Sequence, residues 1–462
     1  MGGALTPPPD SANLREYAVL SGARGRQTFN LAARRAWHAG CSDDGQELIL
    51  HLRAVPSALS SLVPPAQDAL SVLGGWAASS VPARRSSRWL LSVTVLAAAG
   101  LCGAWLAMRH VPWFGPLLAD ELRALVGSER VTELEETVAG VEDRVQQATS
   151  DGKARSLADA TPSELASSLV DADAQGVSQI SAPLAVGPLF AATSSPEDGR
   201  WQAVTARVGA SGAIYRTMIH PDSERAYAEL FVFALDLSKL SVHAVAGSIE
   251  PKSAEPLPDV ARPGVIPESE RGTLVAAFNG GFKAEHGQFG MMVEGTELLA
   301  PKAQSCTFAA SADGGLRIAP WSDLAGAGGL SWWRQTPGCM LQGGELHPGL
   351  RSADSRNWGA TLDGKTVIRR SAVGLSADRR TLFVGISNAT TARALALGMQ
   401  HVGSVDVAQL DVNFSFPRFL LYREGEGNAL NAVGAVRDLL YQPDEYLGHA
   451  STRDFFYVTA RR

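Results

Sequence analysis

The stretch that decides the fold is 273–290, which reads TLVAAFNGGFKAEHGQFG. It opens with an apolar run of strand length, and Asn279, Gly280 and Gly281 follow directly. Because Asn-Gly and Gly-Gly pairs mark turns, the pattern predicts a strand that ends in a tight turn. Such a turn presents main-chain amides and the Asn279 side chain at a sheet edge. His286, further along the same loop, adds a group that titrates near neutral pH.

Three more segments follow in order along the chain. They are GMMVEG at 290–295, RSAVG at 370–374 and QLDVNFS at 409–415. Each segment alone is a weak signal. The ordered set resembles the phosphodiester glycosidases, a family that removes N-acetylglucosamine from a phosphodiester. The resemblance covers about residues 225–460, and a further segment, TPGCMLQGG at 336–344, fits the same order.

The chain departs from the family pattern at two places. Ser387-Asn388 stands where the family has Asp-Gly, and LDVNFS at 410–415 stands where it has Leu-Asp-Gly-Gly-Gly-Ser. Asp411 and Ser415 are retained, but the three glycines are lost. Since glycine allows positive φ and close approach of a ligand to the backbone, the change bears on how a substrate would fit.

Hydrolysis of a sugar phosphodiester needs a cation for the phosphate and a carboxylate for water or the sugar centre. The resemblance implies catalytic roles for Asp411, Arg370, Glu294 and His286. Arg370 would hold the phosphate, Asp411 would be the carboxylate with Glu294 second, and His286 would be an acid or base. It implies substrate-binding roles for Asn279, Gly280, Gly281, Ser371 and Asn413. We expect no cofactor and no metal.

Each of these residues also has a plainer interpretation. Asn279 and Asp411 are ordinary turn formers, Arg370 beside Arg369 is typical of a solvated pair, and His286 is typical of a surface loop. Trp332, Trp333 and Trp358, around the 336–344 segment, could stack on a sugar or lie in the core. Two functions follow. One is a hydrolase, a glycosidase acting on a carbohydrate phosphodiester. The other is an inactive relative that binds a glycan or a protein.

Apolar runs of strand length recur from about residue 201 and are separated by turn residues. One helix is predicted at 391–399 between strands at 381–386 and 405–410, a spacing that fits a βαβ crossover. We therefore predict an α+β domain over 201–462, with a mixed sheet and few helices.

The segment 89–108, WLLSVTVLAAAGLCGAWLAM, carries no charge and is long enough to cross a bilayer. Arg84, Arg85 and Arg88 precede it, so the positive-inside rule places residues 1–88 in the cytoplasm. The segment then acts as a signal anchor, and the C-terminal domain is periplasmic or extracellular. The formal net charge of −6 and the absence of a basic stripe argue against a nucleic-acid partner.

Residues 109–200 are predicted to be a helical stalk and linker. Within the predicted helix 117–148, Val131, Leu134, Val138, Val141 and Val145 recur at spacings of three and four. This spacing is typical of a coiled-coil seam, here about two heptads long. Two interpretations remain, a weak dimer through this helix or an amphipathic helix packed on its own domain. Cys306 and Cys339, both in the exported part, either pair or stay as thiols.

Overall fold

The computed structural model describes much of the chain. The described residues are 17–22, 25–30, 35–41, 48–54, 103, 127–166, 169–171, 183–204, 212–253, 261–326, 328–352, 357–358, 365–412, 415–425, 427 and 429–461. The chain divides into two units, Met1–Gly100 and Leu101–Arg462. The predicted membrane span 89–108 lies outside the described residues apart from Gly103. Of the helices that are described, none is both long enough and apolar enough to span a membrane.

The first unit contains two antiparallel strand pairs. β1 (Tyr17–Gly22) pairs with β2 (Gly25–Asn30), and β3 (Arg35–Cys41) pairs with β4 (Leu48–Ala54).

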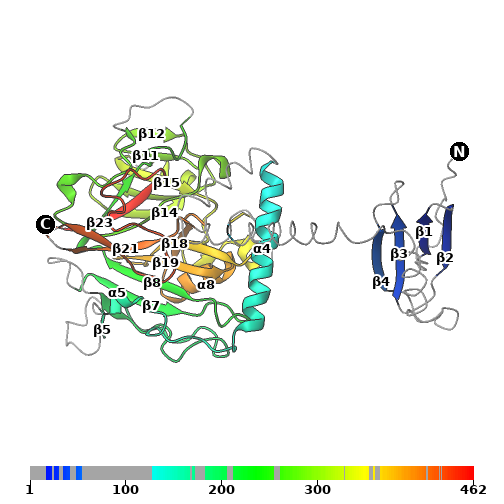
Figure 1. The fold of residues 1–462 in the computed structure, drawn as a ribbon. Coiled ribbons are helices and arrows are strands. Elements are labelled where there is room, and N and C mark those ends of the chain that lie inside the picture. The colour runs from blue at the N-terminus through cyan, green and yellow to red at the C-terminus, as the bar shows by residue number, and fades with distance from the viewer. Residues whose placement is uncertain are drawn as a thin grey trace. The chain divides into compact units, whose positions relative to one another are not determined.

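The second unit is built on three sheets (Figure 1). The largest has nine strands, in the order β17 (Glu345–Leu346), β16 (Leu341–Gln342), β20 (Asp406–Gln409), β18 (Ile368–Leu375), β19 (Thr381–Thr390), β8 (Leu230–Asp236), β7 (Ile214–Ile219), β6 (Gln202–Val204) and β5 (Leu169–Asp171).

Two five-stranded sheets complete the unit. One has the order β22 (Leu430–Gly434), β21 (Phe419–Glu424), β10 (Leu274–Asn279), β23 (Phe455–Ala460) and β9 (Leu240–Val245). The other has the order β12 (Thr296–Leu299), β11 (Met291–Val293), β15 (Leu330–Thr336), β13 (Cys306–Ser311) and β14 (Leu316–Pro320). The predicted strand 273–278 is β10, and it ends at Asn279 as the turn signal requires.

Helices are few, as predicted. In the described ranges the long ones are α4 (Ser128–Thr149) and α8 (Ala392–His401). Single turns are α5 (Ser163–Ala166), α6 (Trp321–Leu324), α7 (Pro348–Arg351), η3 (Glu268–Glu270) and η4 (Ala284–His286). Thr391 caps α8, because its hydroxyl accepts from the Ala394 N–H at 3.1 Å.

The expectation of a mixed sheet needs correction, because the strand pairings recorded in the described residues are antiparallel. β19 and β20 flank α8 as predicted, but they are not hydrogen-bonded to each other. Each pairs antiparallel with β18, which lies between them, so β19 and β20 run in the same direction. The crossover therefore spans an intervening strand. The fold is mostly β.

One hydrophobic core joins the three sheets. The rings of Phe233 on β8 and Phe419 on β21 stack with centroids 4.0 Å apart, and Phe456 on β23 contacts Phe278 and Phe308. Leu157, Ala160 and Leu165, from the predicted linker, belong to the same buried cluster. The chain thus enters the core before residue 201, the predicted start of the domain.

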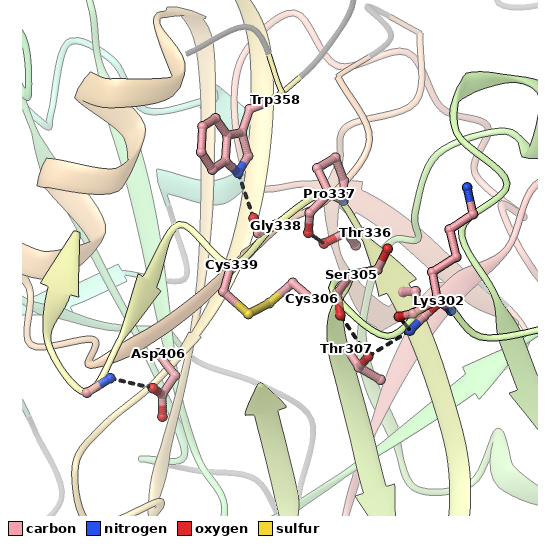
Figure 2. Close-up of a disulfide and its surroundings, with 12 residues drawn as sticks. Lys302, Ser305, Cys306, Thr307, Thr336, Pro337, Gly338, Cys339, Trp358 and Asp406 are labelled. Carbon is pink, nitrogen blue, oxygen red and sulfur yellow. Dashed lines mark hydrogen bonds between the residues drawn. A yellow bond between two sulfur atoms is a disulfide. The ribbon is translucent and has the colours of Figure 1, made fainter. Parts of the chain in front are cut away.

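Cys306 and Cys339 form a disulfide, with Cα atoms 4.7 Å apart (Figure 2). It joins the start of β13 to the loop that follows β15. In the same region the Trp358 indole N–H donates to the Gly338 carbonyl at 2.7 Å. Trp332, Trp333 and Trp358 are all buried. The core interpretation of these tryptophans is therefore the one that the structure supports.

Candidate functional site

Asn279, at the end of β10, connects separate chain segments through side-chain hydrogen bonds. Its side-chain oxygen accepts from the Arg418 N–H at 3.0 Å, and its amide nitrogen donates to Ser371 Oγ at 2.9 Å and to the Gly280 carbonyl at 3.1 Å. Asn279 is 3% exposed. Both amide hydrogens and the oxygen are therefore engaged inside the protein.

Ser371 on β18 extends this connection to the third segment. Its hydroxyl donates to the Asp411 carbonyl at 2.9 Å, and the Asp411 N–H donates to the Gly280 carbonyl at 3.1 Å. Three segments that are far apart in sequence, at 279–281, 371 and 411, thus meet at one place. The structure brings together the predicted residues Asn279, Gly280, Ser371 and Asp411.

The Asp411 carboxylate pairs with Arg453, a residue that the sequence analysis did not identify. One carboxylate oxygen accepts from Arg453 Nη2, and the other accepts from the Val412 N–H at 2.8 Å. The two side chains are 4% and 5% exposed. Arg453 Nη2 also donates to the Gly281 carbonyl at 2.9 Å, which ties the pair to the Asn-Gly-Gly turn.

The Arg453 guanidinium has nitrogen atoms that are not used in the described hydrogen bonds. Its Nε and Nη1 atoms are buried and have no hydrogen-bond partner among the described residues. The guanidinium lies over the ring of Phe416, with its central carbon 4.4 Å from the ring centroid. Arginine presents donors in a planar fork that suits phosphate oxygens. The side chain best equipped to hold an anion next to Asp411 is therefore Arg453.

A second buried ion pair explains the two glycines of the turn. Asp454 accepts from the Gly281 N–H at 2.8 Å and from Arg334 Nε at 2.8 Å. A Cβ on Gly280 would lie 2.1 Å from Asp454 Oδ2, and one on Gly281 would lie 2.8 Å from Arg334 Cζ. In this structure the glycines make room for the protein's own Asp454 and Arg334.

Arg370 lies apart from this cluster. Successive side chains of a strand point to opposite faces, so Arg370 and Ser371 leave β18 on different sides. The Arg370 guanidinium is fully buried and donates to the carbonyls of Thr390, Trp358 and Thr366 and to the side-chain oxygen of Gln409. These acceptors are neutral, and burial lowers the pKa of Arg370 to about 9. Arg370 thus fastens loops on the α8 side of the sheet.

The remaining predicted residues lie at other positions. Glu294 is exposed at the turn between β11 and β12, where its φ of 49° is that of a turn residue. His286 ends η4 and lies 3.5 Å from a carboxylate oxygen of Glu285. The described hydrogen bonds of the Asp411 carboxylate come from Arg453 and from the Val412 N–H. Asn413 lies outside the described residues.

The sequence carried a signal for one of the residues that were missed. Arg334 sits in the run Trp332-Trp333-Arg334-Gln335, and a charge inside a buried strand requires a partner. Arg453 and Asp454 gave no such signal, because adjacent opposite charges ahead of a strand are typical of a surface turn.

Comparisons with known proteins find a weak structural likeness. No family model matches the chain, and no curated protein matches it. Among solved structures, the auto-inhibited catalytic domain of zebrafish N-acetylglucosamine-1-phosphodiester alpha-N-acetylglucosaminidase aligns at a TM-score of 0.34 and 14% identity, covering 54% of this chain and 82% of that one. A hypothetical protein from Synechocystis aligns at a TM-score of 0.32 and 10% identity, covering 54% and 63%. Scores this low carry no argument about function.

Proposed function

We propose that the chain is a hydrolase that cleaves sugar-phosphate diesters, with Asp411 and Arg453 as its acting pair. The observation that supports it most is the meeting of three motif segments around Asp411, beside an arginine with two unused buried donors. Arg453 takes the phosphate-binding role that the motif first suggested for Arg370.

The proposed reaction needs only water as a second reactant. A water oxygen bonds to the anomeric carbon, and the bond from that carbon to the phosphate oxygen breaks. The Asp411 carboxylate accepts the water proton or stabilises the positive charge on the sugar. A phosphate monoester leaves with the bonding electrons, and Arg453 stabilises its charge through hydrogen bonds assisted by opposite charge.

The proposed setting is the outer face of a membrane, with an envelope or extracellular glycan phosphate as the substrate. Two features support it. The uncharged segment 89–108 follows three arginines, and the Cys306–Cys339 disulfide is of a kind that persists in oxidising compartments. Added protease on spheroplasts should then digest the C-terminal unit and spare a tag at Met1. Protection of the C-terminal unit would contradict this topology.

The test of chemistry is turnover of chromogenic sugar-1-phosphodiesters by the full chain. We expect Asp411→Asn to lower kcat/KM on the order of 10²-fold or more, since a lost charge-assisted contact costs a few kcal/mol. Arg453→Lys should raise KM and lower kcat. Glu229→Gln is the matched control. It neutralises a carboxylate that pairs with Arg155, at 2.6 Å between Glu229 Oε1 and Arg155 Nε, and this pair is not part of the site.

Arg370→Lys separates the two assignments of phosphate binding. Full activity in a folded Arg370→Lys chain would support Arg453, whereas selective loss of activity would return the role to Arg370. Absence of turnover by the wild-type chain on every diester tested would contradict the proposal.

A second candidate is an inactive relative that binds a glycan or a protein. Two observations favour it. The Asn279 amide is fully used by the protein, and the Asp411–Arg453 pair is buried next to Phe416. Binding of a sugar phosphodiester without turnover, lost in Arg453→Lys, would select this candidate.

A further inference from the structure

Helix α4 has two apolar faces, and only one of them is covered. Val131, the first residue of the predicted seam, and Ala139 are buried, and Asp143 pairs with Arg225 at 2.9 Å and also accepts from the Tyr227 hydroxyl. These contacts hold the helix on the second unit, at whose rim it stands (Figure 1). Amphipathic packing on the chain's own domain therefore explains one side of α4.

The other apolar face is a stripe of four large side chains, which we call the α4 stripe. Leu134, Val138, Val141 and Val145 are 57%, 45%, 47% and 53% exposed. Elsewhere in the described ranges only Leu184 and Ile249 are large apolar side chains of comparable exposure. At 100° per residue the centre of the stripe lies more than a third of a turn away from Ala139 and Asp143.

The α4 stripe has the geometry of a coiled-coil seam. Its residues recur at spacings of three and four, with valine at the first heptad position (138 and 145) and leucine or valine at the fourth (134 and 141). In parallel coiled coils, β-branched residues at the first position with leucine at the fourth favour two helices over three or four. The stripe runs about 16 Å along the helix at 1.5 Å per residue.

The flanking charges identify the occupant. In this heptad Arg130 and Arg144 precede the seam positions, whereas Glu135 and Glu142 follow them. In a parallel pair of identical helices, Arg130 of one chain lies beside the partner's Glu135. An antiparallel pair would instead set arginine against arginine and glutamate against glutamate. The charge pattern thus fits a second copy of this chain in one orientation.

We propose that the α4 stripe is the contact surface of a parallel homodimer, in which α4 of one chain packs in register on α4 of another. The inference is independent of the proposed hydrolase, because none of its residues contacts the Asp411–Arg453 pair. Each helix uses Ala139 and Asp143 to stay on its own unit and the stripe to meet its partner. Two heptads are short for a coiled coil, so the expected dimer is weak in dilute solution.

The test is site-directed disulfide trapping in the full chain, in cells and after purification. In a Cys41→Ser, Cys102→Ser background, mild oxidation should convert the Val141→Cys and Leu134→Cys chains to a species of twice the chain mass on non-reducing gels. Glu133→Cys is the matched control, because Glu133 is exposed on the same helix but outside the seam. It should stay at the mass of one chain.

Charge reversal tests the orientation. Arg130→Glu and Glu135→Arg should each reduce trapping at Val141→Cys, and the double reversal should restore it. Equal trapping at Glu133→Cys would overturn the proposal. The proposal would also be overturned if the wild-type chain had the mass of a single chain in solution and the cysteine variants formed no disulfide-linked dimer in cells. If the protein were a monomer and the Val141→Cys thiol were still protected from a water-soluble thiol reagent, the stripe would be covered by lipid or by another part of the same chain.

Discussion

The two faces of β18 hold buried arginines in opposite ways. On the Ser371 side, Arg453 and Arg334 each face a carboxylate, Asp411 and Asp454 respectively. On the other side, the described hydrogen-bond partners of Arg370 are neutral oxygens. A paired charge recovers part of its desolvation cost from its partner, whereas a charge held by carbonyls recovers it only through hydrogen bonds. The first arrangement can serve an anionic ligand, and the second fastens loops.

The largest expected effect is on the paired side. Asp454→Asn should lower the free energy of unfolding by about 3–5 kcal/mol, because it leaves the fully buried Arg334 charge without a counter-charge. Denaturant unfolding can be followed by tryptophan fluorescence, since Trp332, Trp333 and Trp358 are buried in this unit. A cost below about 1 kcal/mol would show that the pair contributes little beyond its hydrogen bonds.

Arg370→Met should cost less, about 1–2 kcal/mol in the same measurement. The change removes three hydrogen bonds to carbonyls, but it also removes a buried charge that no carboxylate of the described residues is seen to pair with. The comparison between the two faces would break if Arg370→Met proved as costly as Asp454→Asn.

Ser371→Ala tests the link between the three segments. It removes the bonds to the Asp411 carbonyl and to the Asn279 amide, so the expected cost is about 1 kcal/mol. Ser322→Ala is the control, because that serine is exposed and its hydroxyl donates to its neighbour Asp323 at 3.0 Å. The expected change there is within about 0.5 kcal/mol. Indistinguishable costs would mean that main-chain pairing alone holds the segments together.

The smallest expected change in stability concerns His243. Like Arg370, it has a neutral hydrogen-bond partner, but unlike Arg370 it can lose its charge near neutral pH. It bonds the Thr459 hydroxyl at 2.9 Å and stacks on Tyr457 with ring centroids 4.6 Å apart. Burial lowers the pKa of His243 below 6.5, although the charge of Glu270 acts in the opposite direction. The unfolded chain therefore binds the proton more readily than the folded one.

It follows that the stability contributed by neutral His243 is complete above pH 6.5 and is lost as the pH falls through the lowered pKa. Between pH 6.5 and 5, the wild type should lose about 1 kcal/mol or less relative to His243→Gln. Parallel pH profiles of the two chains would contradict this sign.

Local patterns in the sequence predicted many of the elements. The apolar run at 273–278 and the predicted strands at 381–386 and 405–410 are β10, β19 and β20, and the helix at 391–399 is α8. The Asn-Gly-Gly turn ends β10 as expected. These predictions hold because strand and helix signals depend on residues that are neighbours in the chain.

The sequence was weaker where both faces of a strand are buried. β18 runs from Ile368 to Leu375 and is buried at all positions but its first, so it lacks the alternation that marks a strand with one wet face. The sequence analysis assigned Arg370 and Ser371 to a motif segment and to no strand. The strand instead contains them and sends Arg370 and Ser371 to opposite sides.

By itself, then, the sequence determined which short segments belong to the site region, because the turn residues, Ser371 and Asp411 are local features of the chain. Only the tertiary structure decided which side chains face one another. Arg453 reaches Asp411 across 42 residues, and Arg334 reaches Asp454 across 120. Such pairs depend on the order and register of strands in different sheets, which the packing of a shared core fixes and no local pattern records.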